Sequence, residues 1–92
     1  MMTQKEILTL ALDGAIGVWA DYRFLAGLDG TESCYNYRCN ANEAKLRDAE
    51  EQMEVWSKKC DWIQAQIDAI EAEEKALRRA ERQRQKLSKH AA

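Results

Sequence analysis

The chain of 92 residues contains no proline, only four glycines and a single phenylalanine. Proline and glycine are the residues that most strongly interrupt helices, so few positions of this chain force a break. Glu, Ala, Lys, Arg, Gln and Leu dominate instead, a usage typical of long helices rather than of sheets. The composition therefore predicts an all-α protein.

Neither sign of charge is in large excess, and no long apolar run is present. The 14 basic and 16 acidic residues leave a net charge of −2, which excludes a strongly basic histone-like protein and a strongly acidic DNA mimic. The richest apolar stretch, residues 7–28, is interrupted by Asp13, Asp21 and Arg23. We therefore expect no membrane span and no secretory signal segment.

Cysteine and histidine are scarce, with three and one residues respectively. An odd number of cysteines without a signal segment favours free thiols in a reducing compartment, so we expect a cytoplasmic protein. Two alternatives are a Cys34–Cys39 disulfide and a zinc site that adds Cys60 and His90. Zinc sites usually pair cysteines more closely, and His90 lies about 45 Å along the predicted helix from Cys60. Unlinked thiols are favoured, with no metal and no cofactor.

Catalytic patterns are missing as well. The single histidine leaves no Cys–His or Ser–His pair within a predicted cleft. No glycine-rich phosphate loop is present, and the many carboxylates lie along solvated helix faces. We expect a protein that is not an enzyme.

The first predicted helix spans residues 4–27. Thr3-Gln4-Lys5-Glu6 has the form of a capping box, and Gly27 suits a C-terminal cap. Gly14 and Gly17 each weaken the helix by about 1 kcal/mol and permit close approach of another helix. The apolar surface runs nearly all round, which indicates more than one neighbour. Its apolar residues recur at steps of three and four: Ile7, Leu8, Ala11, Leu12, Ala15, Val18, Trp19, Tyr22, Leu25 and Ala26.

Residues 28–40 lack a helical period and predict a loop. Asp29-Gly30 is a turn signal, and Tyr35 and Tyr37 alternate with polar residues, as in a very short extended piece. The loop is longer than most helix–helix connections, and long ordered loops often carry function. The two tyrosines are therefore candidates for partner contact.

The second predicted helix spans residues 41–88. Asn40 is the expected N-cap, with Glu43 three residues later. No glycine follows, and a heptad pattern typical of a coiled-coil seam begins. Its a positions hold Leu46, Met53, Cys60 and Ile67, and its d positions hold Ala49, Trp56, Ile63, Ile70 and Leu77.

Helix lengths predict the architecture of this single domain: an antiparallel helical hairpin whose long second helix extends as a coiled coil. At about 1.5 Å per residue, the first helix covers the second only to about residue 65. That alignment places Tyr22 near Leu46 and Ala15 near Met53. Beyond that point three apolar side chains would remain uncovered: Ile67, Ile70 and Leu77. Leaving them in water forgoes about 1.5–3 kcal/mol of burial free energy for each. We therefore expect a homodimer, and these three residues are candidates for partner binding.

A second apolar series lies outside the seam. Val55, Trp62, Ala69 and Ala76 repeat every seven residues. An exposed Trp is unusual, and Trp is enriched at binding hot spots, so Val55 and Trp62 are candidates for contact with a protein partner. The alternatives place Trp62 beneath residues 1–7 or within the dimer core.

Charge is segregated along the second helix. Residues 43–74 hold ten acids and four bases, net −6, whereas residues 75–90 hold seven bases and one acid, net +6. A stripe of basic residues on the positive segment can bind phosphates or an acidic partner. Alternatively, the bases stabilise the helix itself, because positive side chains interact favourably with the C-terminal end of a helix dipole. The members of this stripe step by four and three along one face: Lys75, Arg79, Arg82, Lys86 and Lys89.

Two function classes remain. The first is a non-enzymatic protein–protein interaction module, a small dimeric coiled-coil regulator, inhibitor or scaffold acting on a larger protein. The second is a nucleic-acid-binding protein that uses the basic stripe, although the tail lacks aromatics for base stacking.

Overall fold

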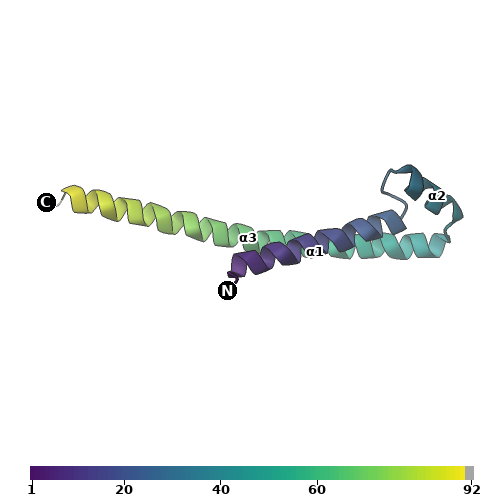
Figure 1. Cartoon of the computed structure of the whole chain (residues 1–92), viewed down its shortest axis with the longest axis horizontal. Coiled ribbons are helices and arrows are strands. Elements are labelled where there is room, and N and C mark those ends of the chain that lie inside the picture. Colours follow the sequence, from purple (N-terminus) through teal and green to yellow (C-terminus); the bar gives the residue numbers. More distant parts are fainter. Residues whose placement is uncertain (91–92) are drawn as a thin grey trace.

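The protein is a rod made of three helices, seen in a computed structural model that describes the backbone of residues 1–90 and the side chains of residues 1–89. They are α1 (Gln4–Leu25), α2 (Glu32–Asn40) and α3 (Glu43–His90), and the described chain contains no strand. The molecule measures 77 × 23 × 21 Å (Figure 1). Over the described residues, no helix combines the length and the apolar character needed to cross a membrane. The predicted all-α hairpin with a long last helix is confirmed.

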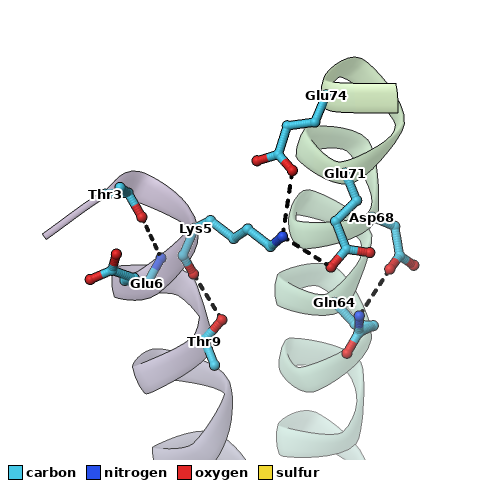
Figure 2. Close-up of polar contacts among 8 residues, drawn as sticks. All are labelled: Thr3, Lys5, Glu6, Thr9, Gln64, Asp68, Glu71 and Glu74. Carbon is cyan, nitrogen blue, oxygen red and sulfur yellow. Dashed lines mark hydrogen bonds and ion pairs between the residues drawn. The ribbon is translucent and has the colours of Figure 1, made fainter. Parts of the chain in front are cut away.

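Both ends of α1 follow from local sequence signals. Thr3 is the N-cap, and its hydroxyl oxygen accepts a hydrogen bond of 3.1 Å from the backbone N–H of Glu6 (Figure 2). At the other end Gly27 adopts a φ of 76°, which glycine reaches without strain. The backbone N–H groups of Gly27 and Leu28 then donate to carbonyls of the last turn. This is a Schellman cap, and α1 ends at Leu25, two residues before the predicted boundary.

Replacing Gly27 by alanine is expected to destabilise the protein more than the same change at Gly30. Both glycines have positive φ, 76° and 78°, so each substitution carries a conformational cost of about 1–2 kcal/mol. A Cβ at Gly27 would also lie 2.8 Å from Cδ of Arg38, whereas nothing lies within 4 Å at Gly30. Urea unfolding of the two variants separates these effects. Equal losses would mean that Arg38 moves aside freely.

The predicted loop over residues 28–40 is wrong in its second half, because residues 32–40 form α2. Thr31 is the N-cap of α2, and its hydroxyl accepts a 3.2 Å hydrogen bond from the backbone N–H of Cys34. The predicted turn at Asp29-Gly30 is present, since Gly30 has positive φ. The sequence did not reveal α2 because the helix is mostly polar and buries little surface, so its apolar residues show no helical period.

The start of α3 also differs from the prediction. Asn40 is the last residue of α2, and Asn42 caps α3 instead. The side-chain Oδ1 of Asn42 accepts a 2.8 Å hydrogen bond from the N–H of Ala44, and its carbonyl accepts from Leu46. An Asn at either position suits an N-cap, and only the presence of α2 decides between them.

The antiparallel packing of α1 on α3 extends farther along α3 than the sequence predicts. The ammonium of Lys5 lies 3.4 Å from a carboxylate oxygen of Glu71 and 3.6 Å from one of Glu74 (Figure 2). The predicted limit was about residue 65, and the predicted pairing of Tyr22 with Leu46 implies the same register. The observed register is displaced by about two helical turns.

This displacement corrects the expected overhang. Ile67 is only 6% exposed and Ile70 is half-buried, so both isoleucines pack within the hairpin, whereas Leu77 is 65% exposed. The physical reason is that the connection contains a helix. Because α2 lies between the two long helices at this end of the rod, α3 starts beyond the end of α1 (Figure 1). The two isoleucines therefore stabilise the monomer and are not available for partner binding, whereas Leu77 is.

The buried core is thin. Four of the five buried apolar residues have small side chains, which lets α1 approach α3 closely but removes little apolar area from water. A chain of this size is marginal when its core is small. The buried residues are Ala15, Ala26, Cys34, Ala49 and Ile67.

Candidate functional site

An open apolar groove lies between α1 and α3. Its volume is about 540 Å³. Two alanines of α1 form one wall, and aromatic and aliphatic side chains of α3 form the floor and the other wall. We call it the groove and define it by its lining residues: Ala11, Ala15, Trp56, Lys58, Lys59, Trp62 and Ile63.

Two tryptophans of α3 line the groove in different ways. Trp56 is half-buried, and the ammonium of Lys59 lies 4.1 Å from the centre of its ring, a cation–π contact. Trp62 is 64% exposed, so the alternative that it packs beneath residues 1–7 is wrong. A tryptophan held this far into water presents a large apolar surface to any chain that enters the groove.

The exposed apolar surface of α3 continues well beyond the groove. Val55 is 42% exposed, and Ala69 and Ala76 are also exposed, so the predicted seven-residue series lies on the surface. Ala80 follows Trp62 by eighteen residues, about five full turns, and therefore lies on the same face. Sequence reasoning missed this continuation, which the steps of four and seven from Ala76 to Ala80 and Leu87 indicate. We call the set the apolar stripe of α3: Val55, Trp62, Ala69, Ala76, Ala80 and Leu87.

The last part of α3 projects alone. Lys5 makes its outermost contact at Glu74, and every residue from 75 to 89 is exposed. Figure 1 shows this segment extending past the N-terminus of α1 without a neighbouring helix. We call residues 75–89 the distal arm. Its predicted basic residues are all exposed and lie together on a different face from the apolar stripe: Lys75, Arg79, Arg82, Lys86 and Lys89.

The two candidate tyrosines lie on α2 and have different surroundings. Tyr37 packs on Phe24 of α1, with 5.4 Å between ring centres, and Cys34 donates a 3.3 Å hydrogen bond from Sγ to the carbonyl of Phe24. These contacts attach α2 to the end of α1. Tyr35 is 67% exposed. Only Tyr35 is therefore open to a partner as the chain stands.

The cysteines do not converge. Cys34 is buried, Cys60 is half-buried and Cys39 is exposed, and all three are free thiols. Among the residues that the structure describes, no three His, Cys, Asp or Glu side chains come together in a way that could hold a metal ion. The side chain of His90, the fourth member of the alternative zinc set, lies outside the described residues.

Gly14 and Gly17 do not accommodate α3. A Cβ built at either glycine meets nothing within 4 Å, so both face open space. Ile7 and Leu10 on the same helix are 54% and 59% exposed. Of the apolar residues of α1 that lie off its main periodic series, Leu10 and Ile16 are 59% and 46% exposed, so this second apolar side is largely uncovered in the single chain.

Comparison of the chain with protein-family models, with curated proteins and with solved structures gives no significant match.

Proposed function

We propose that this protein is a non-enzymatic protein–protein interaction module that binds a helix of another polypeptide along the groove. In this way it forms small dimeric coiled-coil assemblies that act as a regulator, inhibitor or scaffold of a larger protein. The three free thiols fit a cytoplasmic setting. The observation that carries the proposal is the groove itself, lined from two helices and walled by a Trp62 that is 64% exposed.

The chemistry of the groove suits helix binding. Its lining consists of apolar side chains together with Lys58 and Lys59, and the ammonium of Lys59 lies over the ring of Trp56. An amphipathic helix in a groove uses side chains at three- and four-residue spacing, and a central aromatic residue often supplies much of the affinity. The small alanines on α1 leave room for the incoming side chains.

The test places a photo-crosslinking amino acid at position 62 and, as a matched control, at position 64 of the full chain in its native host. Gln64 is exposed on the other flank of α3, where it donates a hydrogen bond to Asp68 (Figure 2). We expect irradiation at position 62 to give a covalent adduct with a second polypeptide, which mass spectrometry identifies. Equal or absent adducts at both positions would contradict an interaction through the groove.

A second candidate function is nucleic-acid binding by the distal arm. The arm carries seven bases and one acid, and all of these residues are exposed. Phosphate contacts of this kind make affinity fall steeply as salt rises. We expect a salt-titrated mobility assay on generic DNA and RNA to show micromolar binding at 50 mM salt if the arm binds phosphates. No shift at 50 mM salt would remove this candidate.

A further inference from the structure

Far more surface is exposed than a chain of this mass normally leaves in water. The accessible area is 7534 Å², whereas a compact protein of 10.6 kDa exposes roughly 5,500 Å². The excess of about 2,000 Å² exceeds the roughly 800 Å² that each partner buries in a standard interface. The single chain therefore has ample area to form a stable complex.

The distal arm lacks the packing that normally maintains a helix. A helix of about fifteen residues is marginal in water when it packs on nothing. All of residues 75–89 are exposed, yet Leu77 and Leu87, at 65% and 68% exposure, have no apolar neighbour from another helix. Burial of the exposed leucines against an apolar surface would therefore stabilise the arm, and the groove offers an exposed apolar surface.

We propose that the groove is occupied by the distal arm of a second copy of this chain, laid antiparallel along α3, so that each copy covers the groove of the other. This inference rests on the proposed function, because it names the partner of the same groove. An antiparallel pairing centred on Glu71 sets Trp62 opposite Ala80 and Val55 opposite Leu87 of the second copy. The largest side chain of the stripe then faces one of the smallest, which is the match that close packing requires.

Charge determines the orientation. In the antiparallel arrangement, each distal arm, net +6, faces residues 53–67 of the other copy, whose two acids and two bases cancel. A parallel arrangement would set the two +6 segments side by side. Screening beyond about 8 Å weakens these forces at physiological salt, so apolar burial supplies the affinity and charge selects the direction.

The mass of the purified full chain tests the association. We expect light scattering at 100 μM protein to give twice the 10.6 kDa of one chain. Trp62→Lys and Ala80→Lys should each raise the dissociation constant at least about tenfold, as central interface changes do. The matched controls Gln64→Lys and Gln85→Lys add the same charge on other faces of α3 and should change it by less than about twofold. Equal effects of all four changes would overturn the proposal.

Photo-crosslinking at position 62 in the purified protein tests the geometry. Residues 62 and 80 of one chain are about 27 Å apart along α3, so a link between them can only join two chains. We expect links from position 62 to residues 75–89. Links that join two chains, recovered from the band of a covalent dimer, between position 62 and residues 55–69 would indicate a parallel pair and overturn the proposal. A monomer at 100 μM would also overturn it, while an adduct with a different polypeptide in the native host would leave the proposed function standing.

Discussion

Replacing Ile67 by lysine is expected to detach α1 from α3 and to lower the free energy of unfolding by about 4 kcal/mol, the largest loss for a single substitution in this chain. Ile67 is only 6% exposed and is the one large aliphatic side chain among the buried residues. An ammonium at this position would have to leave water, and the carboxylate one turn later, Glu71, is already paired with Lys5. Because the core is thin, the loss is comparable to the whole stability of a small domain.

The measurement is helix content by circular dichroism at 25 °C together with urea unfolding. Gln64→Lys is the matched control, since it adds the same charge three residues earlier on the exposed flank of α3. The control should unfold within about 0.5 kcal/mol of the parent chain. If Ile67→Lys unfolds like the control, α1 does not cover position 67 in solution, and the register seen here is wrong.

Trp56→Ala is expected to lower the free energy of unfolding by about 3 kcal/mol. This value lies at the low end for a large-to-small aromatic change, because Trp56 is half-buried and one edge of its ring lines the groove. The contact between its ring and the ammonium of Lys59, 4.1 Å away, is lost as well. The change leaves a hollow between α1 and α3 that the neighbouring small alanines cannot fill.

Trp62→Ala provides the comparison, because it removes the same ring from the same helix at a position that is 64% exposed. At protein concentrations low enough to keep the chain monomeric, its loss should stay below about 1 kcal/mol. Thermal unfolding of both variants by circular dichroism makes the test. Similar melting temperatures would mean that Trp56 is not part of the hairpin core.

The long helices were predictable because their signals are local and repeated. Thr3 begins α1 as the capping pattern predicts, and apolar steps of three and four persist through most of α3. The helix α2 was not predictable by the same means, since it is short and mostly polar, and its contacts with Phe24 of α1, through Cys34 and Tyr37, cover a single helical turn. A Thr at its N-cap, three residues before Cys34, was the available signal.

The register was not predictable from periodicity. A heptad seam looks the same after a shift by whole turns, so the pattern fixes which face of α3 is covered but not how far along it α1 lies. The geometry of α2 decided the shift, and it moved Ile67 from the expected overhang into the core. Trp62 was identified as a candidate because its position lies off the seam, and its exposure follows from that position alone.

The rod shape has a hydrodynamic consequence. The radius of gyration is 21.7 Å, a value that a compact chain would reach only with roughly 400 residues. A single copy should therefore tumble slowly and elute from a sizing column well ahead of its mass. An antiparallel pair centred on Glu71 would measure about 85 Å between the two starts of α3, close to the 77 Å length of one copy. Pairing would thus double the mass of the rod but change its length little. The cross-sectional radius of the rod, rather than its length, would therefore distinguish the pair from the single chain.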